Sequence, residues 1–232
     1  MIKDNLNNIN NKIKSICARV GRDPKSIVLV AVTKYTDVIS AKEAIDAGVK
    51  HVAENYAQDA IKKFEALDKL GVKVTKHFIG HLQTNKVRLI LPVVDLIQSV
   101  DSLKLAQEIE KQAIKINKQM DILVQVNIPG EKQKFGADKD NGFQLVKDII
   151  GLKNIRVLGL MTMAPLAEDK NIIRECFRGL RLLRDEIIEK IGIQNNLEMK
   201  YLSMGMSADY EIALEHGSNM IRVGSAIFEE KL

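Results

Sequence analysis

Short apolar runs alternate with amphipathic stretches along the chain. Residues 3–20 place apolar side chains at positions 9, 13, 16, 17 and 20, which is the spacing of one helix face. The run SIVLVAVTK at 26–34 is rich in β-branched residues and has no polar face, as in a strand buried on both sides. A capping box from Ser40 to Glu43 then predicts the start of a helix, and Gly48 predicts its end.

The same alternation continues to the end of the chain. Further strands are predicted at HVAEN (51–55), KHFIG (76–80), VDLIQSV (94–100), DILVQVN (121–127), IRVLGLM (155–161), MKYLSM (199–204) and MIRVG (220–224). Helices are predicted at 101–117, with Asp101 as N-cap, and at 170–191, with Ile173, Cys176, Phe177, Leu180, Leu183 and Ile187 on one face. Eight strands alternating with helices predict an α/β fold, a (β/α)8 TIM barrel with an extra N-terminal helix, as a single domain over residues 1–232. No GxGxxG follows the first strand, which disfavours an open dinucleotide-binding sheet.

Composition and charge exclude several classes of function. The net charge of +5 is scattered among acidic residues without a basic run, so we expect no nucleic-acid partner. Cys17 and Cys176 form no CxxC pair and the histidines no HExxH motif, so we expect no metal site and a reducing compartment. A polar N-terminus and the lack of an 18-residue apolar run predict a soluble, cytoplasmic protein without membrane contact.

Polar and small residues recur where the predicted strands end. These residues are Lys34, Asn55, Gly80, His81, Ser99, Asn127, Met161, Thr162, Ser203, Gly224 and Ser225. In a barrel of this class the active site lies at the C-terminal ends of the strands. The pattern therefore predicts a polar cup at that end.

Lys34 follows the most apolar strand, where a desolvated amine would suit a Schiff base with an aldehyde. The alternative is a lysine that extends to solvent, and position alone slightly favours it. The segments SMGMSAD (203–209) and RVGSAIF (222–228) each lead from a strand to a helix start, with Ser207 as a cap of the first helix. Together they predict a phosphate site, although two ordinary N-caps would look the same. Arg222, two residues before Gly224, is either a salt-bridged interior residue or a ligand partner.

Six segments of the chain carry a resemblance to a known family. They are AVTK ending at Lys34, AENYAQD (53–59), HFIGHLQTNK (77–86), GLMTM (159–163), YLSMGMSADYEIAL (201–214) and IRVGSAIFEE (221–230). In these segments the chain resembles the pyridoxal phosphate homeostasis proteins (the YggS/PROSC family), whose fold is similar to the N-terminal barrel domain of alanine racemase. The resemblance implies pyridoxal 5′-phosphate (PLP) as cofactor, held as a Schiff base on Lys34. It further implies the following contacts: Asn55 near the ring, Arg222 facing the ring nitrogen, Ser207, Gly224 and Ser225 on the phosphate with backbone help from Met206, and Ser203 and Met161 in the pocket wall. The segment HFIGHLQTNK is a signature of the family, and the role of His81, Gln83 and Asn85 within it stays open.

The resemblance favours a PLP-binding protein of vitamin B6 homeostasis, with no catalytic residue of its own. The alternative is a PLP-dependent amino-acid racemase, which needs a second base, and in racemase-like enzymes this is a tyrosine from a further β domain. The chain ends soon after its last predicted strand, which disfavours that alternative, although Tyr56 beside Asn55 could approach the pocket. A Schiff-base aldolase is the third candidate and leaves Arg222 unexplained. The expected partners are PLP and other B6 vitamers, with PLP-dependent apoenzymes as candidate recipients, and the expected state is a monomer.

Overall fold

A closed barrel of eight parallel strands forms the centre of the protein, seen in a computed structural model that describes residues 1–131 and 133–229. The strands are β1 (Val28–Val32), β2 (His51–Glu54), β3 (Thr75–Phe78), β4 (Leu96–Val100), β5 (Met120–Asn127), β7 (Ile155–Met161), β8 (Leu197–Ser203) and β9 (Met220–Val223). Neighbours pair in the order β4-β3-β2-β1-β9-β8-β7-β5, and a β4–β5 pairing closes the ring. A two-residue strand, β6 (Ala137–Asp138), adds to the end of β5. The predicted TIM barrel and its eight main strands are confirmed.

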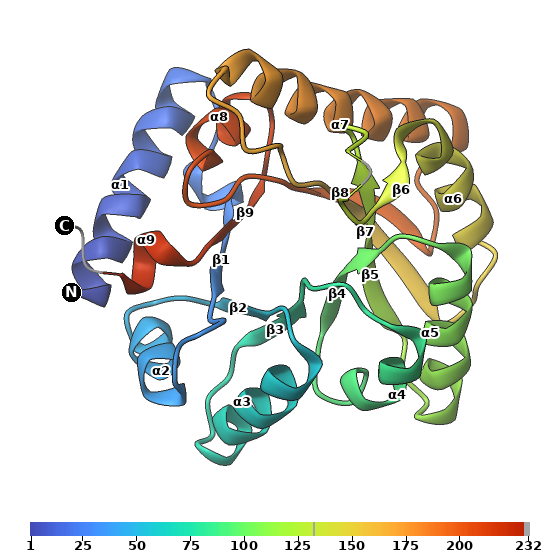
Figure 1. The fold of residues 1–232 in the computed structure, drawn as a ribbon, viewed down its shortest axis with the longest axis horizontal. Helices are drawn as coiled ribbons and strands as arrows, with labels where there is room; N and C mark the ends of the chain where they lie inside the picture. The colour runs from blue at the N-terminus through green and yellow to red at the C-terminus, as the bar shows by residue number, and fades with distance from the viewer. Residues whose placement is uncertain (132, 230–232) are drawn as a thin grey trace.

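Helices surround the strands (Figure 1). They are α1 (Ile2–Arg19), α2 (Val38–Asp46), α3 (Ala57–Lys69), α4 (Val87–Ile90), α5 (Leu103–Lys115), α6 (Gly142–Ile149), α7 (Lys170–Ile191), α8 (Tyr210–Glu215) and α9 (Ser225–Phe228), with short 3-10 turns at Pro24–Ser26, Thr84–Lys86 and Lys139–Asn141. One α-helix follows each of the eight barrel strands, which leaves α1 as the predicted extra helix. No helix among the described residues is both long enough and apolar enough to cross a membrane.

Helix α1 holds the last two helices in place. It lies beside α8 and α9 (Figure 1), and one apolar stripe along it is buried. The side-chain amide of Asn5 donates a hydrogen bond of 3.0 Å to the carbonyl oxygen of Ile227 in α9. Lys12 pairs with Glu211 of α8 at 2.6 Å. Because α9 begins at the cavity described below, α1 supports one wall of the site from outside.

Two predicted helix starts are wrong, the first by three residues and the second by one. Asp37, not Ser40, caps α2, and its carboxylate accepts a hydrogen bond from the Ser40 backbone N–H at 2.7 Å. Ser102, not Asp101, caps α5 by accepting from the Leu105 N–H at 3.4 Å. In each case two polar residues near the strand end are chemically able to cap. The backbone direction after the strand decides between them.

The barrel separates an outer core from an inner one. The outer core lies between strands and helices, and the predicted α7 stripe is buried in it throughout. The inner core contains Val30, Val32, Ala53, Leu96, Leu123, Leu158, Met161 and Met220. Arg156, paired with Asp121 at 2.8 Å and with Glu198 at 3.4 Å, lies near the N-terminal ends of the strands. Buried polar side chains share the interior with the inner core, and they become important below.

Candidate functional site

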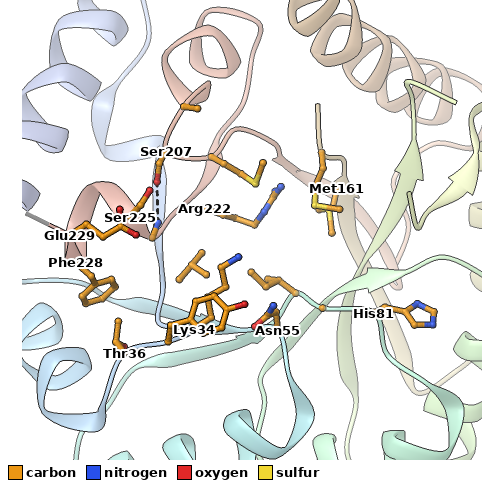
Figure 2. Close-up of a pocket in the computed structure, with 18 of the residues that line it drawn as sticks. Lys34, Thr36, Asn55, His81, Met161, Ser207, Arg222, Ser225, Phe228 and Glu229 are labelled. Carbon is orange, nitrogen blue, oxygen red and sulfur yellow. Dashed lines mark hydrogen bonds between the residues drawn. The ribbon is translucent and has the colours of Figure 1, made fainter. Parts of the chain in front are cut away.

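A cavity of about 670 Å³ opens at the C-terminal ends of the barrel strands, where the polar cup was predicted. Its lining residues are Val32, Lys34, Tyr35, Thr36, Asn55, Ile79, Gly80, His81, Gln125, Phe135, Met161, Met163, Met206, Ser207, Ala208, Arg222, Gly224, Ser225, Phe228 and Glu229. Eight of the nine residues predicted for the site are among them. Figure 2 shows most of these side chains converging from opposite walls.

Lys34 lies in the turn that follows β1, and its exposed side chain lines the cavity. The side chain therefore reaches solvent, as the alternative interpretation required, and still faces the other site residues (Figure 2). The next residue, Tyr35, has a φ of 65°, which is rare for a residue with a side chain. Such a backbone conformation persists only where the surrounding contacts fix it.

A buried ion pair beneath this turn supplies those contacts. The Nζ of Lys63 in α3 lies 2.5 Å from the Oε1 of Glu54 and 2.5 Å from the carbonyl oxygen of Thr33. The hydroxyl of Thr33 donates to the same Glu54 oxygen at 2.6 Å, and that of Thr36 donates to the Thr33 carbonyl oxygen at 2.8 Å. Thr33, before the Lys34–Tyr35 step, is thus tied to α3 and β2, and Thr36, after it, is tied to Thr33.

Asn55 lies beside Lys34, at the end of the neighbouring strand β2 (Figure 2). Its Oδ1 is buried and has no hydrogen-bond partner among the described residues. Gly80 packs against its backbone, and a Cβ atom at that position would lie only 1.8 Å from the Asn55 carbonyl oxygen. Position 80 therefore requires glycine, which lets β3 approach closely enough to place Asn55 at the cavity. A buried, unpaired amide oxygen at a cavity wall is suited to accept a hydrogen bond from a ligand.

The loops after β8 and β9 form the opposite wall. The hydroxyl oxygen of Ser207 accepts hydrogen bonds from the backbone N–H of Gly224 at 3.3 Å, dashed in Figure 2, and of Ala226 at 3.4 Å. The prediction that Ser207 caps its own helix is wrong, because α8 begins three residues later with Asp209 at its N-cap. Ser207 instead reaches across to the start of α9. The two predicted phosphate segments do come together. They place the hydroxyls of Ser207 and Ser225 at one corner of the cavity, beside the Gly224 and Ala226 N–H groups that bond to Ser207.

Asp209 binds the backbone of the loop at this corner. Its carboxylate is buried and accepts a hydrogen bond of 2.6 Å from the backbone N–H of Met206, and burial raises the pKa of Asp209 above its usual range. The Met206 N–H, expected to help hold a phosphate, is therefore already paired within its loop. Its contact with a ligand stays a prediction.

Arg222 projects from β9 into the floor of the cavity, between Ser207 and Met161 in Figure 2. Only 3% of the residue is exposed, and burial lowers its pKa to about 10, which leaves the guanidinium charged at neutral pH. One Nη donates to the hydroxyl oxygen of Ser203 at 2.7 Å and the other to the carbonyl oxygen of Thr162 at 2.9 Å. No carboxylate is among these hydrogen-bond partners. They therefore do not support the interpretation of Arg222 as a salt-bridged interior residue. Ser203 lies beneath Arg222 and is the one predicted site residue that does not line the cavity.

Sequence reasoning missed other parts of the wall. Phe135, in the loop after β5, stacks on the His81 ring with the ring centroids 3.9 Å apart. His81 thus belongs to the cavity wall, whereas Gln83 and Asn85 line a separate hollow of about 460 Å³ beside it. No local pattern marks Phe135, because its position depends on how the loop folds over the barrel. No cluster that could hold a metal occurs among the described residues.

The residues present fit the cofactor that the resemblance implies. An amine at the mouth, an unpaired amide oxygen, a corner of backbone N–H groups and a buried guanidinium all face one cavity. These groups suit an anionic aromatic aldehyde, which needs a nucleophile, donors for its phosphate and a charged partner for its ring.

Comparison with known proteins gives consistent matches along the whole chain. A family profile described as alanine racemase, N-terminal domain, matches residues 5–231. The chain is 39% identical over 228 residues to the pyridoxal phosphate homeostasis protein of Aquifex aeolicus, covering 98% of this chain and 97% of that protein. It is 34% identical over 229 residues to the protein of the same name in Escherichia coli K12, covering 98% and 95%.

Solved structures agree with the fold. An unknown protein from Bifidobacterium adolescentis matches with a TM-score of 0.91 and 35% identity, covering 98% of this chain and 94% of that one. PipY of Synechococcus elongatus, solved with PLP bound, matches with a TM-score of 0.84 and 29% identity, covering 98% and 100%. An alanine racemase of Clostridium difficile matches in fold with a TM-score of 0.77 and 17% identity, covering 98% of this chain and 57% of the racemase.

Proposed function

Because the chain belongs to the family of pyridoxal phosphate homeostasis proteins, with the alanine racemase N-terminal fold, we propose that it binds PLP in the cavity and serves vitamin B6 homeostasis. One observation carries the proposal. The amine of Lys34, the donors around Ser207 and the guanidinium of Arg222 line the same cavity, although they come from three different loops or strands. These are the three kinds of group that a phosphorylated pyridine aldehyde requires.

Each wall of the cavity has its own part in binding. Lys34 forms a Schiff base with the aldehyde, and Ser207, Gly224 and Ser225 hold the phosphate with the help of Met206. Asn55 and Met161 contact the ring, and Ser203 acts through Arg222. Arg222 faces the ring nitrogen and keeps it unprotonated, because two adjacent positive charges repel. When bound, the cofactor supplies a ring that withdraws electrons from an attached amino group, and an unprotonated nitrogen weakens that effect.

We assign the protein a carrier role rather than an enzymatic one. Lys34 is exposed at the mouth, so a cofactor held there is accessible to water and to an acceptor. In this role the protein also receives other B6 vitamers and passes PLP to PLP-dependent apoenzymes, as a monomer. Cys17 and Cys176 are buried free thiols, which supports a cytoplasmic, reducing location.

Spectroscopy of the purified protein with PLP tests this proposal. We expect the absorption of a protonated Schiff base in the parent and its loss in Lys34→Arg, which keeps the charge but forms no Schiff base. Dialysed holo-protein should activate a PLP-dependent apoenzyme and should not racemise L-alanine. A protein that shows neither the absorption band nor any PLP binding would refute the cofactor assignment. Racemisation that depends on Lys34 would replace the carrier role with the racemase.

A further inference from the structure

A line of buried polar side chains runs from Arg222 through the inside of the barrel. The Ser203 hydroxyl, which accepts from Arg222 at 2.7 Å, lies 2.6 Å from the Oε1 of Gln98 in β4. The Nε2 of Gln98 lies 2.7 Å from the Nδ1 of His77 in β3. The Nε2 of His77 lies 3.0 Å from the Nδ1 of His51, the first residue of β2. The line therefore leads from the cavity floor to the end of the barrel opposite the cavity.

The guanidinium fixes the direction of every hydrogen bond in the line. Arginine can only donate, so Ser203 accepts from it and directs its own proton to Gln98 Oε1. The amide nitrogen of Gln98 then faces His77 Nδ1 and donates to it. His77 must accept at Nδ1, and as a neutral ring it carries its proton on Nε2 and donates that proton to His51. The reverse direction would give Ser203 two donors and leave its own proton without an acceptor along the line.

Burial supports this reading of the histidines. His77 is 1% exposed, and burial, with a smaller contribution from His51, lowers its pKa to about 3, so the ring is neutral at physiological pH. Burial also lowers the pKa of the half-buried His51. Gln98 is fully buried and makes one further contact, 3.3 Å from the sulfur of Met220. Polar groups in such a core are costly unless they are fully paired, and a paired network fixes one arrangement.

We propose that Gln98, His77 and His51 are positioning residues for Arg222, and that the line holds the guanidinium in the one orientation that faces the cavity. The guanidinium is held at two points, the Thr162 carbonyl oxygen and the Ser203 hydroxyl, and of these only the hydroxyl can rotate. A Ser203 whose own proton is committed to Gln98 presents its lone pair to Arg222 in a fixed direction. The consequence for the cofactor rests on the proposed function, since Arg222 acts on the PLP ring nitrogen there. The line itself belongs to the protein without cofactor.

The first test uses the cofactor-free protein labelled with ¹⁵N in its histidines. Nitrogen shifts distinguish a protonated ring nitrogen from an unprotonated one. We expect His77 to carry its proton on Nε2 at neutral pH and to remain in that single form. A proton on Nδ1, or a mixture of the two forms, would overturn the proposal whether or not the protein binds PLP.

The second test is a double-mutant cycle on PLP affinity. Gln98→Met keeps the length of the side chain and removes both bonds, and we expect roughly 10-fold weaker PLP binding with a shifted absorption band, because a charged group loses its orientation. In an Arg222→Met background the same change should have no further effect, since a positioning residue acts only through the group it positions. Ser218→Ala is the matched control: this buried hydroxyl bonds only to backbone carbonyl groups of the same region and should leave the band in place.

The outcomes separate the two claims. Equal effects of Gln98→Met with and without Arg222 would show a general loss of packing and refute the positioning role. If Arg222→Met does not fold, the absorption bands of Gln98→Met and Ser218→Ala decide the positioning role. A shift in Gln98→Met alone supports it, and no shift or equal shifts refute it. If the parent binds no PLP, the proposed function fails, and slow exchange of the Arg222 guanidinium protons in the parent, lost in Gln98→Met, still decides whether the line orients the arginine.

Discussion

Lys63→Met should destabilise the protein strongly, because it breaks the buried ion pair beneath the Lys34 turn. Glu54 is fully buried and the Lys63 side chain is 8% exposed. Methionine preserves most of the packing of the lysine stem but removes the ammonium group. The remaining carboxylate keeps only the Thr33 hydroxyl as a partner, and the Thr33 carbonyl loses the donor that ties it to α3.

The expected loss is about 3–5 kcal/mol in the free energy of unfolding, the cost of leaving one buried charge without its partner. The combined variant Lys63→Met, Glu54→Leu removes both charges and should recover most of that loss, since an apolar pair of similar volume is often neutral. Lys42→Met is the matched surface control. Lys42 pairs with Asp46 one helical turn away in solvent, and its loss should cost about 0.5 kcal/mol or less.

Chemical denaturation of the cofactor-free protein measures these differences, and equilibrium dialysis of bound PLP measures their effect on the site. The combined variant should regain stability and still hold PLP more weakly, because Thr33 has lost its anchor and the Lys34–Tyr35 turn is no longer fixed. A loss of less than about 1 kcal/mol in Lys63→Met would refute the reasoning, since the pair would then contribute no more than a surface pair does.

Three further predictions concern other parts of the site. Gly80→Ala should lower the free energy of unfolding by about 2 kcal/mol or more, measured by thermal denaturation, and should displace Asn55. Gly151→Ala is the control and should lower it far less, because its Cβ would meet only an ordinary contact at 3.5 Å. Equal losses in the two variants would contradict the close approach of Gly80 to Asn55. Ser207→Ala should weaken PLP binding about 10-fold by equilibrium dialysis, because the Gly224 and Ala226 donors lose their organising partner, and an unchanged affinity would place the phosphate elsewhere. Because the His77 pKa is lowered to about 3 from 6.5, the unfolded chain binds more protons between these values, so stability should fall as pH falls through that window, by up to about 1.4 kcal/mol per pH unit. In His77→Asn that part of the slope should disappear, and identical slopes in the two proteins would contradict the buried, neutral ring.

Local patterns were sufficient to predict the barrel. A strand buried on both sides and a helix with one apolar stripe differ in period, and both periods are visible in stretches such as 26–34 and 170–191. The ends of the strands could not be predicted fully from these patterns. The third strand was predicted over 76–80 but ends at Phe78, because Gly80 must turn against Asn55. The two-residue β6 has no pattern of its own and exists only through its pairing with β5.

The cavity was predictable to the extent that it follows from the fold class. Residues just past the strand ends had to lie near one another, which brought Lys34, Asn55 and Ser207 together. Partners within the barrel were not predictable, because alternation along a strand gives the face of a residue but not its neighbour on the next strand. Gln98 and His77 stand in the sequence as isolated polar residues in apolar runs, and no local pattern marks Lys63 as buried. Only the register of the closed barrel places Gln98 between His77 and Ser203.

Reductive trapping tests the central claim most directly. The purified protein is incubated with PLP, reduced with borohydride, digested and mapped by mass spectrometry across all of its lysines. The account predicts one dominant pyridoxyl adduct, on Lys34, and its absence in Lys34→Arg. An adduct distributed over surface lysines, or one that persists unchanged when Lys34 is replaced, would contradict a cofactor site built around Lys34 and Arg222.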